Sequence, residues 1–266
     1  PAEPGARHDQ WQGSVIQGFV DAGYFVCTLD HQGHGLSEGI DGLKAYVQQF
    51  DDLPGESTAY VRDVLLKMPK LYGLPIFLFG ISMGGATAVR MAQAHPDFYR
   101  GVVLYSPMLS LEQIREKPFC LGLKTKHLLP FAGVLNCACP RRALIATVKN
   151  TIHPLSQTEF DEDPLTYKGD CRVGTSCAFE QITTRFMNGL LAEMRTPFVT
   201  FHCAGDTFTD PLGSRAIFER ASTEDKAFVE VGPGKQLDLV MWHALTVEPG
   251  HEVVFEHALA WVQERT

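Results

Sequence analysis

The chain has 266 residues and a formal net charge of −8, and 45% of its residues are hydrophobic. This length accommodates one large α/β domain, or a domain with a substantial insertion, around a buried core. The acidic balance and the lack of a basic run argue against nucleic acid as a partner. No apolar segment approaches the roughly twenty residues that a membrane-spanning helix needs.

Cysteine usage indicates a reducing compartment. The seven cysteines form an odd set whose spacing matches no zinc-binding pattern, and we expect no metal site. We interpret them as reduced thiols in a cytoplasmic protein, with an extracellular disulfide framework as the alternative. The first residues, PAEPGARH, lack the apolar run of a signal peptide and are typical of a chain that begins within a fold.

Helical and strand patterns alternate in the first part of the chain, and short apolar runs there are typical of buried strands. This order predicts an α/β fold with a mostly parallel sheet and helices on both of its faces. The expected helices are Trp11–Ala22, Gly55–Tyr72 and 85–95, and the expected strands are Tyr24–Leu29, Ile76–Phe79 and Gly101–Pro107.

Residues 108–195 break this alternation and form a predicted cap, or lid, between the core segments 1–107 and 196–266. Short helices and loops without a buried strand are expected there, over Leu111–Glu116, Cys120–Phe131, Arg142–Asn150 and Phe179–Met194. The uncharged stretch His127–Pro140 either covers the site as a lid or packs on the core. The later core elements are strands at Pro197–His202 and Ala227–Val231 and helices at Ser214–Ala221 and Val253–Val262.

The stretch Pro75–Ala88, PIFLFGISMGGATA, carries the clearest functional motif. Ser82 stands between Gly80 and Gly84, directly after the strand and before the helix. Such a tight turn needs glycine two positions to either side so that the strand and the helix can pass. The pattern is typical of a nucleophile elbow, which presents Ser82 at the strand end and aims the Met83 N–H at a developing oxyanion.

A serine hydroxyl becomes an effective nucleophile when a histidine takes its proton and a carboxylate orients that histidine. In this architecture the chain order is serine, acid, histidine, with each partner on a loop after a later strand. Asp206 and His243 occupy such loops in that order after Ser82, so we predict a triad. The alternative makes Asp206 a turn former and His243 an ordinary loop histidine.

Other residues compete for the two partner roles. Asp210 is the rival acid, but Asp206 is nearer to the end of its strand. Among the ten histidines, only His243, His251 and His257 lie beyond Asp206 in the chain. The last two fall on the closing helix, too far from the strand ends to reach the serine.

A glycine-rich turn occupies Asp30–Gly39, DHQGHGLSEG. Its glycines do not fall as GxGxxG and no lysine follows directly, so a structural turn is favoured over a phosphate site. We interpret His31 and His34 as hydrogen-bonded loop residues instead of metal ligands, because no further ligand stands nearby.

These motifs together give the chain a resemblance to the monoacylglycerol lipase branch of the α/β-hydrolase family, over nearly its whole length. The turn DHQGHGLSEG looks like the DHxGHGxSEG of that branch, and the elbow GISMGG is similar to its GHSMGG. Three further segments resemble its acid, histidine and cap signatures: AGD at Ala204–Asp206, WHALTVEP at Trp242–Pro249, and DPLTYKG at Asp163–Gly169.

The resemblance implies an α/β-hydrolase fold, with Ser82, Asp206 and His243 as the triad and the residues after Met108 as the cap. It implies hydrolysis of monoacylglycerols, lysophospholipids or related small acyl esters without a metal or organic cofactor. The cap also leaves open a peripheral contact with a membrane.

The chain departs from the branch pattern at three places. The oxyanion loop HGxGxH corresponds to Glu3–His8, EPGARH, where Gly5 would supply the second oxyanion N–H. Ile81 replaces the usual histidine of the elbow. The segment between Val231 and His243 is longer than in the family.

We therefore predict a serine ester hydrolase that acts on a lipid-like acyl substrate through an acyl-enzyme intermediate. A lysophospholipase, a thioesterase or a serine peptidase on the same frame is the alternative, since the triad does not choose between these bonds. A non-catalytic binding protein that retains the fold is a further alternative from another class.

Overall fold

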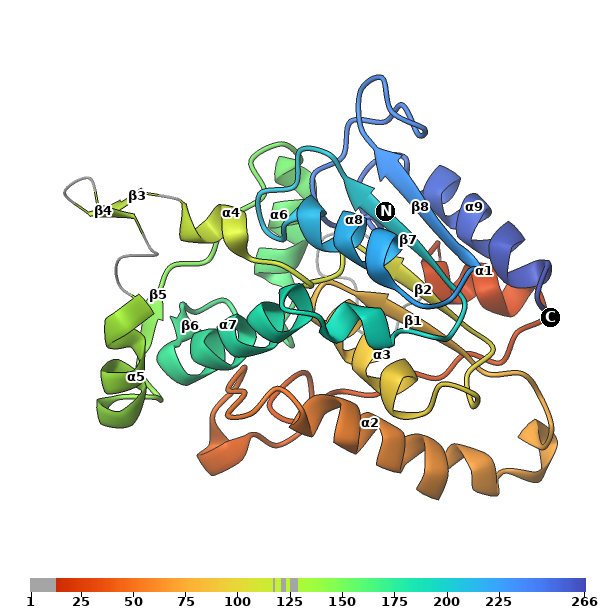
Figure 1. The fold of residues 1–266 in the computed structure, drawn as a ribbon, viewed down its shortest axis with the longest axis horizontal. Coiled ribbons are helices and arrows are strands. Elements are labelled where there is room, and N and C mark those ends of the chain that lie inside the picture. The colour runs from red at the N-terminus through yellow and green to blue at the C-terminus, as the bar shows by residue number, and fades with distance from the viewer. Residues whose placement is uncertain (1–12, 117, 121–122, 125–128) are drawn as a thin grey trace.

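A parallel four-stranded sheet forms the centre of the fold, in the order β1-β2-β7-β8 (Figure 1). The computed structural model describes residues 13–116, 118–120, 123–124 and 129–266. The strands are Phe77–Ile81 (β1), Gly101–Tyr105 (β2), Phe198–Cys203 (β7) and Lys226–Val231 (β8). Parallel strands with helical crossovers confirm the α/β prediction.

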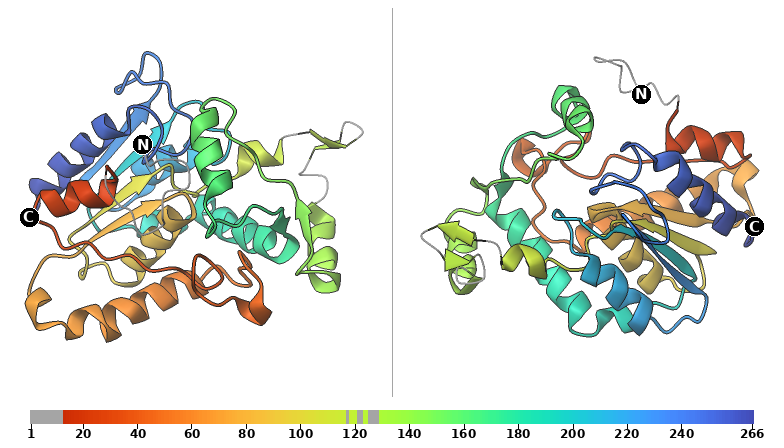
Figure 2. Two further views of the ribbon diagram at one scale, coloured as in Figure 1. Left: turned by 180° about the vertical axis from the view of Figure 1, so that it is seen from behind. Right: turned by 90° about the horizontal axis from the view of Figure 1, so that it is seen from above.

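The two faces of the sheet bury two separate hydrophobic clusters. β2 contributes to both, because alternate side chains of a strand point to opposite faces: Val102 and Leu104 enter one cluster, Val103 and Tyr105 the other. The helices covering the first face are α2 (Asp52–Asp63), α3 (Met83–Ala94) and α8 (Pro211–Arg220), whereas α1 (Val15–Asp21) and α9 (His251–Gln263) cover the second (Figure 2).

Residues 108–195, which we call the inserted segment, add no strand to the central sheet among their described residues. Most of the segment lies beyond the ends toward which the arrows of β7 and β8 point (Figure 1). Its elements are α4 (Glu112–Arg115), β3 (Pro118–Cys120), β4 (Leu123–Lys124), α5 (Leu129–Ala138), β5 (Ala143–Ile145), α6 (Pro154–Glu162), β6 (Cys171–Arg172) and α7 (Val173–Met187), followed by a 3-10 turn at Leu190–Glu193.

α7 anchors the inserted segment to the core. Ile182 and Phe186 of this helix are 1% and 0% exposed and join the cluster around α3. Two ion pairs add to the attachment: Asp51, before α2, accepts from Arg90 of α3 at 3.1 Å and from Arg185 of α7 at 2.7 Å. The segment is thus held to the sheet mainly through its last helix.

Three predicted elements differ from the structure, and the strand at Tyr24–Leu29 is the largest error. This segment is irregular, and Phe25 and Leu29 are 50% and 37% exposed. A strand needs a ladder of backbone hydrogen bonds. Among the described residues, the only backbone pairing of this segment is Tyr24 N–H to Phe19 O. The short apolar run is typical of a strand, but no strand among the described residues pairs with it.

The predicted helix Gly55–Tyr72 ends early, at Asp63, and continues as 3-10 turns at Leu65–Lys67 and Pro69–Leu71. Pro69 lacks an N–H and disfavours helical geometry at the residue before it, so the regular helix cannot run through. Arg142–Asn150, where short helices or loops were expected, also contains a strand. Its first residues form β5, which pairs antiparallel with β6.

Candidate active site

Ser82 occupies a strained turn between β1 and α3. Its backbone angles are φ 51° and ψ −118°, and residues other than glycine rarely adopt a positive φ. Neighbouring backbone groups fix this turn: Ser82 N–H donates to Tyr105 O at 3.0 Å, and Ser82 O accepts from Gly85 and Met108 at 3.0 and 2.9 Å. The surrounding structure therefore maintains the conformation expected of a nucleophile elbow.

Two glycines make this turn possible: Gly80, which is a flanking position of the motif, and Gly85, which is not. A Cβ at Gly80 would lie 2.5 Å from Gly84 O, and one at Gly85 would lie 2.6 Å from the Cβ of Pro107. At Gly84, nothing stands within 4 Å of such a Cβ. The predicted need for glycine before the serine is therefore supported. The second close approach belongs to Gly85 instead of Gly84.

Met83 is the first residue of α3. The N–H groups of a first helical turn have no acceptor within the helix, and the helix dipole adds partial positive charge there. This is the arrangement that an oxyanion requires, although Met83 as its donor stays a prediction. Gly5, the predicted second donor, lies outside the described residues.

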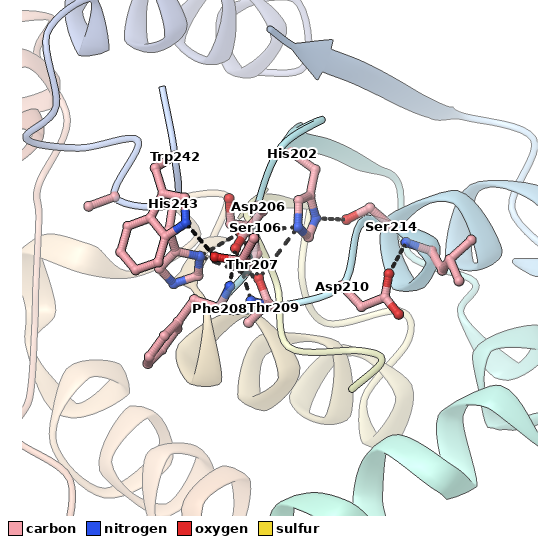
Figure 3. Close-up of polar contacts among 12 residues, drawn as sticks. Ser106, His202, Asp206, Thr207, Phe208, Thr209, Asp210, Ser214, Trp242 and His243 are labelled. Atoms are coloured by element: carbon pink, nitrogen blue, oxygen red, sulfur yellow. Dashed lines mark hydrogen bonds and ion pairs between the residues drawn. The ribbon is translucent and has the colours of Figure 1, made fainter. Parts of the chain in front are cut away.

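Asp206 and His243 meet behind the ends of the central strands. His243 Nδ1 lies 2.7 Å from Asp206 Oδ2, although 37 positions separate them in the chain (Figure 3). Both are buried, with 2% and 9% of the residue exposed. The Asp206 carboxylate also accepts from Phe208 N–H at 2.7 Å, from Thr209 N–H at 3.0 Å and from Thr209 Oγ1 at 2.9 Å. Its orientation toward the imidazole is thereby fixed.

The electrostatic surroundings keep Asp206 ionised. Burial by itself would raise the pKa of this carboxyl, because it penalises the charged form. Hydrogen bonds and charge from His202 and His243 outweigh burial and hold the pKa of Asp206 well below its ordinary value. A carboxylate accepts only, so the facing Nδ1 of His243 donates and the free ring nitrogen, Nε2, is left to accept a proton.

A second buried histidine lies behind the acid, and the sequence analysis missed it. His202, the fifth residue of β7, is 0% exposed, and its Nε2 lies 3.3 Å from Asp206 Oδ2. Its Nδ1 is 2.7 Å from Ser214 Oγ (Figure 3). The same Ser214 oxygen is 3.1 Å from Thr200 Oγ1. A histidine in a buried strand, four positions before the acid, was the available signal.

The rival residues have other partners. Asp210 begins α8 as its N-cap, accepting from Leu212 N–H at 3.0 Å, and also receives Ser110 Oγ at 3.2 Å. His251 and His257 lie on α9, and their Nδ1 atoms contact backbone oxygens at 3.1 and 2.9 Å. Asp206 and His243 are therefore the pair that the fold brings together, as the loop positions predicted.

The nucleophile and the base are not bonded to each other in this structure. Among the hydrogen bonds of the described residues, none joins the Ser82 hydroxyl to His243. Two aromatic rings flank the imidazole: the centroid of Phe208 lies 4.9 Å and that of Trp242 6.0 Å from the His243 ring. The three-membered triad stays a prediction, built from an elbow and a paired acid and base that the structure describes.

Contacts within the glycine-rich turn support its structural interpretation. The Asp30 carboxylate accepts from Leu36 N–H at 2.9 Å, and Lys44 Nζ donates to Gly35 O and Ser37 O at 2.9 and 2.8 Å. His34 Nδ1 lies 3.0 Å from a backbone oxygen, as expected for a hydrogen-bonded loop residue. His31 differs from this expectation, because its buried Nδ1 has no hydrogen-bond partner among the described residues. Across the described ranges, no group of three or more histidine, cysteine or acidic residues is placed to hold a metal ion.

A parallel sheet with flanking helices, an elbow serine, and an acid–histidine pair on later loops define the class of α/β-hydrolase serine hydrolases. Residues 5–249 match the family model Hydrolase_4, described as serine aminopeptidase, S33. The chain belongs to this family.

Curated relatives and a solved structure agree with this assignment. The chain is 31% identical to human monoglyceride lipase over 256 residues, which cover 91% of this chain and 74% of the relative. It is 28% identical to caffeoylshikimate esterase of Arabidopsis thaliana over 255 residues, covering 94% and 72%. The structure of Paleococcus ferrophilus monoacylglycerol lipase superposes with a TM-score of 0.72 at 22% identity, covering 98% of this chain and 91% of that one.

These similarities confirm the predicted α/β-hydrolase fold and the predicted resemblance to monoacylglycerol lipases. They also confirm that the chain is a serine ester hydrolase by family. Within the described part of the chain, none of the helices is both long enough and apolar enough to cross a membrane.

Proposed function

We propose that the protein hydrolyses monoacylglycerols or closely related lipid-like acyl esters, with Ser82, Asp206 and His243 as the catalytic triad. The observation that carries the proposal is the buried 2.7 Å contact between His243 and Asp206, on loops that follow the elbow serine in the required chain order. No metal or organic cofactor has a part in this mechanism.

The reaction proceeds through two acyl transfers. His243 Nε2 takes the proton of Ser82 as its Oγ attacks the ester carbonyl, and Asp206 stabilises the imidazolium that forms. The Met83 N–H donates to the oxyanion of the tetrahedral intermediate. Collapse of this intermediate expels the alcohol, which takes the proton from His243. Water, activated by the same histidine, then releases the fatty acid and restores Ser82.

The inserted segment supports a lipid-like substrate. Several of its apolar side chains face solvent. Burying them against an apolar ligand or surface would be favourable by about 25 cal/mol per Å² of apolar area. The exposed fractions are 69% for Val134, 56% for Leu144, 81% for Leu155 and 49% for Phe160. We propose that this segment, residues 108–195, is a cap on a core made of residues 1–107 and 196–266. We also propose that its apolar surface contacts lipid aggregates or a membrane surface.

The name of the matching family favours one further candidate, a serine aminopeptidase. The same triad attacks an amide, and a lysophospholipase or thioesterase differs only in the leaving group. Rates on monoacylglycerols, lysophospholipids, acyl thioesters and aminoacyl amides distinguish these activities. A monoacylglycerol as the best substrate by kcat/KM supports our proposal, and an aminoacyl amide as the best substrate contradicts it.

Hydrolysis of p-nitrophenyl octanoate by the purified protein tests the nucleophile. We expect Ser82→Ala to lower kcat by at least about 1,000-fold. The exposed Ser222 provides the matched control, and Ser222→Ala should retain the parent rate. Covalent labelling of the parent, but not of Ser82→Ala, by a fluorophosphonate would rule out a non-catalytic binding protein. An unchanged rate in Ser82→Ala would contradict the proposal.

A further inference from the structure

Glu248 is a buried carboxylate for which the proposed reaction has no role. It is 0% exposed and lies five residues after the proposed base, in the loop before α9. Its Oε2 accepts from Trp242 N–H at 2.6 Å, and its Oε1 accepts from His243 N–H at 3.2 Å and Ala244 N–H at 3.0 Å. One side chain therefore binds the backbone of three successive residues centred on His243.

These bonds matter because, beyond one bridge between Val231 and Leu237, the loop has no ladder of backbone hydrogen bonds. The residues from β8 to α9 form neither a helix nor a strand. Buried backbone N–H groups need acceptors, and an ionisable acceptor makes stronger hydrogen bonds than a neutral one. The carboxylate takes the place that a neighbouring strand would fill. Glu248 thus fixes the backbone of His243, and with it the position from which the imidazole side chain extends.

The same carboxylate reaches the inserted segment. Asn150 is 7% exposed and donates from Nδ2 to Glu248 Oε1 at 2.8 Å. Its Oδ1 accepts from the N–H groups of Ile152 and His153 at 3.1 and 2.8 Å. His153 Nε2 in turn lies 3.0 Å from Val240 O. The inserted segment therefore contacts the histidine loop both before His243, at Val240, and after it, at Glu248.

We infer that Glu248 is a positioning residue for His243, and that Asn150 makes the inserted segment part of this support. The inference rests on the proposed function, in which His243 is the base. A misplacement of about 1 Å in such a group costs a rate factor of up to about 100. The position of the base is thus coupled to the attachment of the inserted segment, through the Asn150 to Glu248 bond.

Glu248→Gln tests the carboxylate, because it keeps the shape but replaces one acceptor oxygen with a donor. We measure kcat on p-nitrophenyl octanoate per Ser82 that a fluorophosphonate titrates, so that unfolded protein does not count. We expect a fall of about 10- to 100-fold with KM changed less than about threefold. Glu256→Gln, at an exposed position of α9, should match the parent.

Asn150→Asp tests the bridge without removing the loop around it. The acceptor oxygen for Ile152 and His153 is retained, while the donor to Glu248 becomes an oxygen that repels it. We expect kcat per titrated serine to fall about tenfold. Adding Glu248→Gln to Asn150→Asp supplies a donor across the bridge, so the double variant should lose less than the two single losses multiplied.

The outcomes separate this inference from the proposed function. A parent protein without esterase activity, or an unchanged Ser82→Ala, would remove the proposed function. An active parent whose Glu248→Gln and Asn150→Asp variants both keep the parent kcat per titrated serine would overturn this inference alone. If Glu248→Gln yields no titratable protein, Asn150→Asp decides: a lowered kcat supports the inference and an unchanged kcat overturns it.

Discussion

The nucleophile and the acid–histidine pair are held by different means. Ser82 depends on backbone geometry within one strand, one turn and one helix, and its requirement is space for the chain at Gly80 and Gly85. Asp206 and His243 depend on side-chain hydrogen bonds between segments that are 37 positions apart. The motif of the first half of the site thus lies in one short stretch of sequence, although Tyr105 O and Met108 N–H also hold the turn. The second half forms only when the loops after β7 and β8 assemble.

This difference predicts opposite sensitivities. A change that adds volume should damage the nucleophile side, while a change that keeps the shape but alters hydrogen bonding should leave it intact. The acid–histidine side should instead be damaged by nearly isosteric substitutions, because these remove donors, acceptors or charge. The variants below separate these two kinds of effect.

The largest effect is expected for Asp206→Asn, which keeps the shape and removes the charge. The amide no longer enforces the imidazole tautomer that leaves Nε2 free, nor stabilises the imidazolium, so kcat should fall about 10,000-fold. Steady-state hydrolysis of p-nitrophenyl octanoate measures this loss. Asp210→Asn is the matched control, because asparagine is an equally good helix N-cap, and its kcat should stay within about threefold of the parent. Equal losses in both variants would contradict the assignment of the acid.

The elbow gives the next largest effect, this time on folding. Gly80→Ala places a methyl group 2.5 Å from the Gly84 carbonyl oxygen, so the strand or the helix must move. We expect the free energy of unfolding to drop by about 3 kcal/mol in urea titrations. Gly84→Ala adds the same methyl group where nothing lies within 4 Å, and should change stability by less than about 1 kcal/mol. Similar losses at both positions would show that the elbow is not limited by this approach.

The sequence predicted the local half of the site in more detail than the assembled half. The elbow motif lies within one short stretch, so GISMGG and its strand and helix identified Ser82 directly, but not the bonds from Ser82 to Tyr105 and Met108. Asp206 and His243 were predicted from chain order, but their supports were not. His202 lies four positions before Asp206, and Glu248 five positions after His243. Each by itself looks like an ordinary polar residue of a strand or a loop, and the sequence does not show which side chain it contacts.

The same reasoning explains the errors in the fold. β1, β2, β7 and β8 were predicted because each contains a short run of mostly apolar residues, as is typical of strands in a parallel sheet. Residues 24–29 share that composition but have no ladder partner among the described residues, and a single sequence does not show pairing. β5 and β6 are short strands that pair with each other across a long intervening stretch of chain, so the sequence of Arg142–Asn150 did not show that a strand forms there.

The dependence of stability on acid pH is a further test of the acid–histidine side, because Asp206 is a buried charged group there. Its pKa in the folded chain is below the ordinary value of 3.8, since bonds from His202 and His243 outweigh burial. Such a group contributes stability above its unfolded pKa, and loses it as the pH falls toward the folded one. Between about pH 5 and pH 3, the parent should lose on the order of 1 kcal/mol more unfolding free energy than Asp206→Asn. Parallel curves from urea titrations would show that Asp206 is not the group responsible.

The smallest effect is expected at the far end of the buried network, at Ser214. Ser214→Ala removes the hydroxyl that lies 2.7 Å from His202 Nδ1 and leaves that buried nitrogen without this partner. The free energy of unfolding should fall by about 1 kcal/mol, while kcat changes less than about threefold, because the substitution reaches His243 only through His202 and Asp206. Urea unfolding and ester hydrolysis measure the two quantities, with Ser222→Ala as the exposed control. A loss of kcat as large as that of Asp206→Asn would show that the whole row from Ser214 to His243 acts as one unit. The acid–histidine half would then be as sensitive at its periphery as at its centre, unlike the elbow, where Gly80 and Gly84 are expected to differ although each lies two positions from Ser82.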